Sequence, residues 1–175
     1  IGREVSGRRL NYLLREAEAE TREALEPFGY YSPIIVIQRS DRSRPEGEDA
    51  DPGARAAASD REEQRSLSIS IRVDPGTPVR VRTWNVGVAG DAASDHQVVG
   101  ALDSFAPRKG DVLDHALYDS SRARVSRTLA ARGYFDADFD ARRVEVTRAD
   151  HAADIDLRWT SGTRFALDTV TFSQA

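Results

Sequence analysis

The sequence predicts an α+β fold in which one small unit of two helices and three strands is repeated in tandem. Two matches support this prediction. The stretch Gly76-Thr-Pro-Val-Arg-Val-Arg-Thr aligns with Gly162-Thr-Arg-Phe-Ala-Leu-Asp-Thr, and an alternating apolar segment precedes both. The helix ends Leu25-Glu-Pro-Phe-Gly-Tyr-Tyr and Leu129-Ala-Ala-Arg-Gly-Tyr-Phe also match. An internal repeat constrains the architecture more than any single motif, so it determines the predicted fold class.

Composition limits the function classes that remain. The 175 residues are 39% hydrophobic and 31% charged, which supports cores of modest size. Cysteine is absent, which excludes disulfides, thiolate metal sites and cysteine nucleophiles. The net charge of −4 argues against a protein that binds a phosphate backbone. No apolar run is long enough to span a bilayer, and because the chain starts in mid-pattern we expect it to be a piece of a longer protein.

The first half is expected to contain one helix and two strands. Apolar residues recur at three- and four-residue steps from Leu10 to Phe28, and Gly29 can end that helix in the left-handed conformation. The β-branched run Ile34 to Ile37 and the alternation from Leu67 to Val73 each predict a strand. Residues 41–65 between them are dense in charge and poor in core residues, so we expect a disordered loop there.

Two helices are expected in the second half. The first has Ser94 or Asp95 as its N-cap and is closed by Pro107, and its inner face would carry Val98, Val99, Leu102 and Phe105. The second begins near Asp114 and ends at Gly133, and its inward residues would be Leu117, Tyr118, Val125 and Leu129.

Three strands complete this second copy. The strand from Val79 changes parity near Arg82-Thr83, which predicts either a bulge or one strand that serves two sheets in succession. The strands Phe139 to Val146 and Ala153 to Trp159 follow, with a second bulge expected near Arg142-Arg143.

These elements predict the domain boundaries. Residues 1–76 would form a first module that lacks its opening strand and helix, and residues 77–162 a complete second module. Residues 163–175 would be the first strand of a third module.

A β-α-α-β-β unit whose second helix closes in Gly-Tyr-aromatic resembles the POTRA (polypeptide-transport-associated) domain. The matching segments are Gly110-Asp-Val-Leu-Asp-His-Ala-Leu-Tyr and Gly133-Tyr-Phe-Asp-Ala. In the first copy, Arg22-Glu-Ala-Leu-Glu-Pro-Phe-Gly-Tyr-Tyr-Ser-Pro and Ile71-Arg-Val-Asp-Pro-Gly-Thr-Pro-Val-Arg-Val are similar to the TamA (translocation and assembly module) family of the Omp85 superfamily. The resemblance covers nearly the whole chain outside residues 41–65, and the charged loop and the missing start of the first module depart from it.

This resemblance implies tandem POTRA modules, each with two helices packed on a three-stranded mixed sheet. It implies a place in the periplasm of a Gram-negative bacterium, as the soluble part of an outer-membrane protein whose own C-terminal barrel is absent here. The implied role is assembly of outer-membrane barrels and secretion of autotransporters, with unfolded clients and a TamB-like inner-membrane-anchored partner. Alternatives within the superfamily are a BamA-like assembly factor and a two-partner secretion transporter.

The mechanism expected for such a module is β-augmentation, in which an extended client segment pairs with an open strand edge. By resemblance the edge strand follows Gly-Tyr-aromatic, which gives Ile34, Ile35, Val36 and Ile37 in the first module and Arg142, Val144 and Val146 in the second. The alternative for the first segment is burial of both faces, one under the helix and one against a neighbouring module. For the segment in the second module, the alternative is an edge that its bulge and charges protect against pairing with another strand.

The motif residues themselves are assigned a structural role. These residues are Gly29, Tyr30, Tyr31, Gly133, Tyr134 and Phe135. Their rings are expected to anchor a helix end onto the sheet rather than to bind an aromatic or proline-rich ligand.

No catalytic, cofactor or metal site is predicted. Asp136-Ala-Asp-Phe-Asp140 lacks the glycine and glutamate of a calcium loop, and His96, His115 and His151 have no ligand spacing. A KH-like nucleic-acid module would need Gly-x-x-Gly between its helices, where this chain has Ala106-Pro-Arg-Lys-Gly110. The sequence therefore predicts a protein-binding module that is neither an enzyme nor a nucleic-acid binder.

Overall fold

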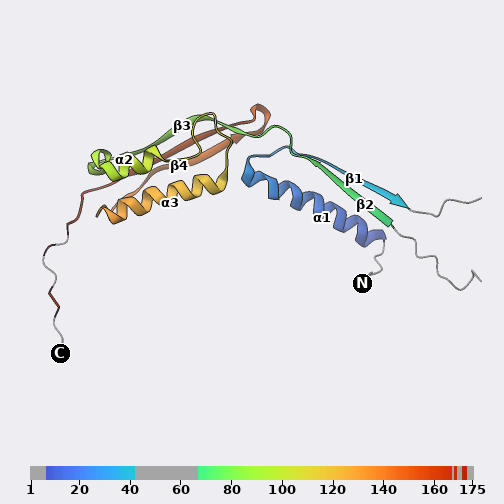
Figure 1. The fold of residues 1–175 in the computed structure, drawn as a ribbon, viewed down its shortest axis with the longest axis horizontal. Coiled ribbons are helices and arrows are strands. Elements are labelled where there is room, and N and C mark those ends of the chain that lie inside the picture. Colours follow the sequence, from blue (N-terminus) through green and yellow to red (C-terminus); the bar gives the residue numbers. More distant parts are fainter. Residues whose placement is uncertain (1–6, 42–66, 167, 169–170, 173–175) are drawn as a thin grey trace, which may run out of the picture.

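The computed structural model describes residues 7–41, 67–166, 168 and 171–172. In chain order its elements are α1 (Gly7–Leu25), η1 (Glu26–Phe28), β1 (Ile34–Asp41), β2 (Leu67–Asp74), β3 (Arg80–Ala89), η3 (Asp91–Ser94), α2 (His96–Asp103), α3 (His115–Ala131), β4 (Asp138–Thr147), η4 (Arg148–Asp150) and β5 (Ala152–Thr160). Figure 1 shows α1, β1 and β2 as one group and the remaining helices and strands as another. The predicted loop lies outside the described residues, apart from Asp41 at the end of β1.

The second group is a complete module. Its sheet has the order β3-β5-β4, with β3 parallel and β4 antiparallel to the central β5. Ile155, Leu157 and Trp159 alternate along β5 and pack in one cluster with residues of α2 and α3, so both helices cover the same face of the sheet. The predicted α+β unit of two helices on a three-stranded mixed sheet is confirmed for residues 80–160.

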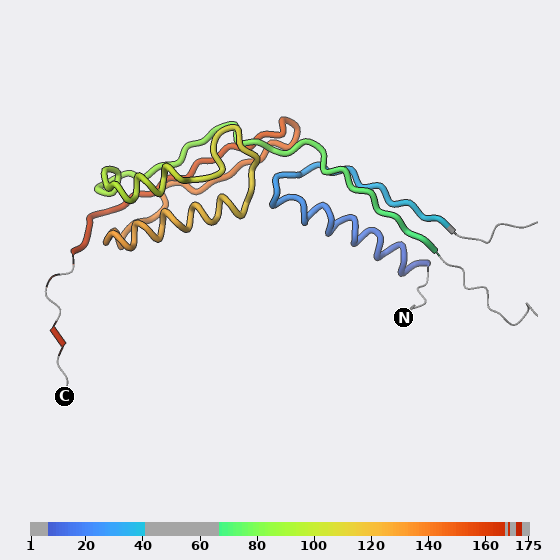
Figure 2. Tube along the Cα trace, in the orientation of Figure 1, coloured from blue at the N-terminus to red at the C-terminus, as the bar shows by residue number. Residues whose placement is uncertain are grey.

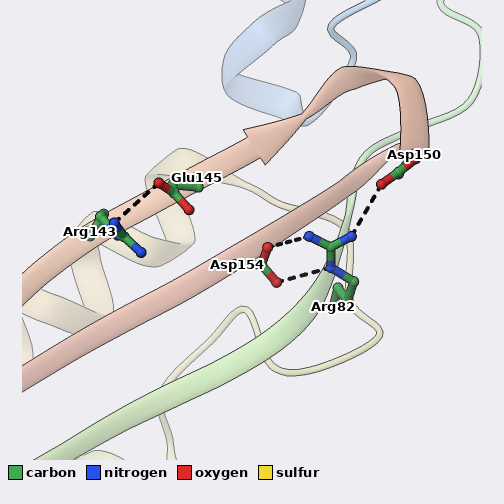
Figure 3. A network of polar contacts seen from close by, with 5 residues as sticks. All are labelled: Arg82, Arg143, Glu145, Asp150 and Asp154. Carbon is green, nitrogen blue, oxygen red and sulfur yellow. Dashed lines mark hydrogen bonds and ion pairs between the residues drawn. The ribbon is translucent and has the colours of Figure 1, made fainter.

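The opposite face of this sheet is polar. Arg82 on β3 donates to both carboxylate oxygens of Asp154 and lies 3.3 Å from Asp150 (Figure 3). Arg143 and Glu145 form a further ion pair at 3.3 Å on β4. Because charged residues alternate with the core residues along these strands, one face of the sheet is packed and the other is solvated.

The predicted strand irregularities are partly confirmed. The register of β3 against β5 shifts between Val81 and Thr83, where the parity change was expected. The second predicted position is wrong, because β4 shifts register between Phe139 and Ala141 rather than near Arg142-Arg143. The extra residue, Asp140, brings Arg142 to the helix side, where its guanidinium lies 5.4 Å from the Phe139 ring centroid. Long side chains such as arginine can lie along an apolar surface. The sequence prediction counted Arg142 as a residue of the polar face, and the bulge was therefore placed too late in the strand.

The helix starts follow the sequence prediction. Asp95 accepts a hydrogen bond from Gln97 N–H at the start of α2, and Asp114 accepts one from Leu117 N–H at the start of α3. The prediction that Leu117 points inward is wrong, since half of its surface is exposed. Tyr118 does point inward, as predicted, and packs edge-on against Phe105, with ring centroids 6.0 Å apart.

The first group has its own, smaller set of contacts. β1 and β2 form a two-stranded antiparallel ribbon with an unbroken register. α1 reaches it through Arg22, which donates to the Pro33 carbonyl at 2.8 Å, and Asn11, which accepts from Arg39 at 2.6 Å. The cluster of buried residues in the second group contains none from α1 or β2, so the two groups do not share a continuous core. Figure 2 shows the chain passing from β2 into β3 where the groups meet.

Candidate protein-binding site

The edge strand predicted in the first module is open along its outer side. Among the described residues β1 pairs only with β2, which leaves its other edge without a strand neighbour. Ile34 and Val36 face away from α1 and are 62% and 43% exposed. Ile35 and Ile37 lie on the other face and are partly buried. The alternative in which both faces are covered therefore does not hold for the described part of the chain.

The edge strand predicted in the second module is different. β4 pairs only with β5, so its outer edge is also open in the described structure. Val144 and Val146 face the core and are partly buried, whereas Arg142 is exposed. The bulge at Asp140 and the neighbouring charged side chains are features that protect strand edges against pairing. Of the two predicted edges, β1 is the one with an unbroken register, and its first half is apolar.

The Gly-Tyr-aromatic motif links each helix end to a later segment of the chain, which is Val79 just before β3 in the first copy and Phe165, outside any helix or strand, in the second. Gly29 and Gly133 have φ of 87° and 89°, the left-handed conformation expected of a residue that ends a helix. The Gly29 carbonyl accepts from Val79 N–H at 2.8 Å, and the Gly133 carbonyl accepts from Phe165 N–H at 2.8 Å. The same backbone bond therefore occurs in both copies of the repeat.

Close backbone approach explains why both positions are glycine. A Cβ atom at Gly29 would lie 2.9 Å from the Leu113 carbonyl oxygen, and one at Gly133 would lie 2.3 Å from the Phe165 carbonyl oxygen. Neither distance is compatible with a side chain. At both positions the glycine joins a helix end closely to a distant backbone segment.

The rings of the motif act differently in the two copies. Tyr134 is buried in the core of the second module, while Tyr30 is only partly buried. Tyr31 packs on the second module, where its hydroxyl shares a hydrogen bond of 2.6 Å with His115 Nε2. Phe135, the residue equivalent to Tyr31, is 62% exposed and contacts the Phe165 ring.

A small polar cluster completes the joint between the modules. The Arg148 guanidinium lies 5.7 Å from the Tyr31 ring centroid and 3.0 Å from the Glu26 carboxylate. Burial raises the pKa of Tyr31, the Glu26 charge raises it further, and Arg148 opposes this. Sequence reasoning did not pair Tyr31 with His115 or Arg148 because both lie far from it along the chain.

The described residues offer no group of three or more histidine, aspartate or glutamate side chains arranged to hold a metal. The most buried carboxylate of an ion pair, Asp95, caps α2 and is paired with Arg132 at 2.9 Å, and Arg132 lowers its pKa. These contacts are structural. Within the part of the chain that the structure covers, no helix is long and apolar enough to cross a membrane.

Comparison with known protein families identifies the domain type. The family model described as "POTRA domain TamA domain 1" matches residues 2–50. This first part of the chain is therefore similar to the first POTRA domain of the TamA family. POTRA domains are non-catalytic, and the second module has the helix and sheet arrangement expected for this fold.

Two solved structures are similar to this POTRA chain. The crystal structure of Haemophilus influenzae BamA POTRA3-5 is 15% identical with a TM-score of 0.43, and the alignment covers 93% of this chain and 54% of that one. BamA from Haemophilus ducreyi lacking POTRA domains 1–3 is 16% identical with a TM-score of 0.38, and the alignment covers 91% of this chain and 24% of that one. The chain therefore spans about half of the first structure and about a quarter of the second.

Proposed function

We propose that this chain is the periplasmic POTRA region of a TamA-like assembly factor of the outer membrane, and that it holds unfolded client strands by β-augmentation. The observation that carries the proposal is the outer edge of β1, which is unbulged, apolar over residues 34–37 and without a strand neighbour among the described residues. The family match over residues 2–50, which includes β1, supports the assignment to the TamA type over a BamA-like factor or a two-partner secretion transporter.

The chemistry of such an edge suits clients of many sequences. Backbone N–H and C=O groups of β1 would pair with those of the client, and each bond made in water contributes only about 0.5–1.5 kcal/mol. Ile34 and Val36 would add apolar contacts without demanding a particular residue. A client would thus be held along eight residues of β1 and still be released.

The proposed partners follow from this role. The clients would be unfolded outer-membrane β-barrels or autotransporters, and the POTRA region would be joined to a C-terminal barrel of the same protein. A TamB-like partner anchored in the inner membrane would use a second surface, for which the edge of β4 with Arg142, Val144 and Val146 is the candidate.

The proposed domain division has residues 1–76 as an incomplete first module, 77–162 as the second module and 163–175 as the start of a third. The hydrogen bond from Phe165 N–H to the Gly133 carbonyl supports the last boundary, because its equivalent opens the second module.

The test uses proline at two adjacent positions of β1, Ile35→Pro and Val36→Pro. Successive residues of a strand direct their N–H groups to opposite edges, so one variant loses a bond to β2 and the other loses a donor on the open edge only. The probe is a fluorescein-labelled peptide of twelve alternating valine and threonine residues, and binding is followed by fluorescence anisotropy. The variant that keeps its circular dichroism spectrum and melting curve should bind the peptide several-fold more weakly. Unchanged binding in that variant would exclude β1 as the capturing edge.

A further inference from the structure

Two separate connections join the first module to the second. One is the chain itself, which passes from β2 to β3 through residues 75–79. The other is a set of four side chains, which we call the latch: Glu26 and Tyr31 from the first module, and His115 and Arg148 from the second. Domains joined by a linker alone are expected to move relative to one another. A second point of attachment restricts that motion.

The linker is itself stiff. Two of its five residues are proline, and each proline fixes one backbone φ angle. Gly76 N–H donates to the Asp74 carboxylate at 3.0 Å, which closes a turn at the start of the linker. At its other end, Val79 N–H donates to the Gly29 carbonyl at 2.8 Å. Little unconstrained backbone therefore remains between β2 and β3.

The latch is built around the ring of Tyr31. This ring packs against the core of the second module, and its hydroxyl shares a hydrogen bond of 2.6 Å with His115 Nε2. The Arg148 guanidinium lies 5.7 Å from the ring centroid and 3.0 Å from the Glu26 carboxylate. A planar guanidinium can face a ring and pair with a carboxylate at the same time. Because the three contacts share one ring and one arginine, the loss of one weakens the others.

The second copy of the repeat shows that the helix end does not need a latch. There Gly133 has the same left-handed conformation and makes the same backbone bond. Phe135 stands at the position of Tyr31 and has no hydroxyl. Ala130 stands at the position of Glu26 and has no carboxylate. The contacts of the latch are therefore additional to the Gly-Tyr-aromatic motif and require a different explanation.

We propose that the latch fixes the angle between the two modules, so that residues 7–41 and 67–160 move as one rigid body. His115 and Arg148 are then positioning residues. Tyr31 lies just before β1, and Arg148 directly follows β4, so the latch holds one of the two proposed binding strands in a fixed direction relative to the other. This inference goes beyond the proposed function and does not depend on what either strand binds.

The test measures the distance between the modules in the complete 1–175 chain, which has no cysteine of its own. Ala19→Cys on α1 and Ala123→Cys on α3 carry nitroxide labels at exposed positions outside the latch. Double electron–electron resonance then gives the distribution of the label-to-label distance. We expect one narrow distribution with the latch intact. Tyr31→Phe combined with Arg148→Gln removes both polar contacts and should widen the distribution about twofold or more.

Matched variants separate the latch from a general effect of lost charge. Arg143→Gln removes another exposed ion pair of the second module, that with Glu145, and should leave the distribution unchanged. Glu26→Arg and Arg148→Glu should each widen it. The two together rebuild the ion pair with the charges exchanged, so the distribution should be narrower than with either change alone.

Folding is checked in the same samples. Trp84 and Trp159 both belong to the second module, so an unchanged fluorescence spectrum shows that this module is intact, and circular dichroism reports on α1. Arg148→Gln alone, at an exposed side chain, should keep both signals and still widen the distribution.

Two results would overturn the proposal. A broad distribution in the chain with an intact latch would mean that the modules rotate freely. A narrow distribution in the folded Tyr31→Phe/Arg148→Gln chain would mean that the linker alone fixes the angle. Neither result bears on capture by β1, which is measured separately with the valine and threonine peptide.

Discussion

Leu157 and Ile71 occupy equivalent positions in the two copies of the repeat, yet the first is fully buried and the second is exposed. Both strands have the same apolar alternation and both have an antiparallel neighbour on one edge. What differs is the parallel strand and the helix that follows it, which only the second copy has among the described residues. The comparison shows that one strand and one helix convert a half-exposed ribbon into a packed module.

The largest expected effect follows directly from this contrast. Leu157→Ala should lower the free energy of unfolding of the second module by about 2–5 kcal/mol, because it leaves a cavity in a close-packed core. Ile71→Ala should cost about 1 kcal/mol or less, because the side chain is already in contact with water. Urea titration followed by circular dichroism measures both. Equal losses would mean that β2 is as well packed in solution as β5.

A second contrast lies between glycines with the same backbone conformation. Gly29 and Gly110 both have positive φ. A Cβ atom at Gly29 would collide with the Leu113 carbonyl oxygen, whereas a Cβ atom at Gly110 would have no atom within 4 Å. Each alanine substitution should lower the free energy of unfolding by about 1–2 kcal/mol, because the residue must adopt the left-handed conformation. Gly29→Ala should destabilise the chain further, because the Leu113 carbonyl must move. The difference between the melting temperatures of Gly29→Ala and Gly110→Ala measures the effect of the close approach at Gly29. A lower melting temperature for Gly110→Ala than for Gly29→Ala would contradict this explanation.

The smallest expected effect concerns the joint, where Tyr31 and Phe135 are equivalent. The pKa of Tyr31 in the folded chain lies above its ordinary value of 10.0, mainly because of burial. The unfolded state therefore releases this proton first, so the contribution of Tyr31 to stability is fully present below pH 10 and is lost as the pH rises through the folded pKa. Tyr31→Phe should lose about 0.5–1.5 kcal/mol with its hydrogen bond to His115 and should flatten this alkaline decline.

The measurement is chemical unfolding between pH 8 and 11. Tyr118→Phe is the matched control, because burial also raises the pKa of Tyr118 but this residue lies within the second module. Phe135→Ala, at the equivalent exposed position, should change stability by less than about 0.5 kcal/mol. An alkaline decline of unchanged slope in Tyr31→Phe would show that the joint contributes nothing to the folded state.

Local signals in the sequence were reliable guides to the elements. The caps at Asp95 and Asp114, the helix ends at Gly29 and Gly133 and the parity change at Arg82 all act over a few residues, and each was located correctly. The bulge in β4 was misplaced because Arg142 lies on the core side, which depends on its contact with Phe139 rather than on hydropathy. Leu117 and its neighbour Tyr118 were both assigned inward, because hydropathy does not show that only Tyr118 fits against Phe105.

The repeat and its element order could be read from spacing and alternation, since these patterns follow from the backbone geometry of helices and strands, whereas the POTRA fold was expected from the family resemblance. Three features emerged only from the folded chain. The first is the set of contacts that Tyr31 makes with His115 and Arg148. The others are the unbroken register of β1 beside the bulged β4, and the exposed apolar face of β2. Each depends on which distant segments become neighbours. Burial and pairing are properties of those neighbours, so identical local patterns in the two copies lead to different surfaces.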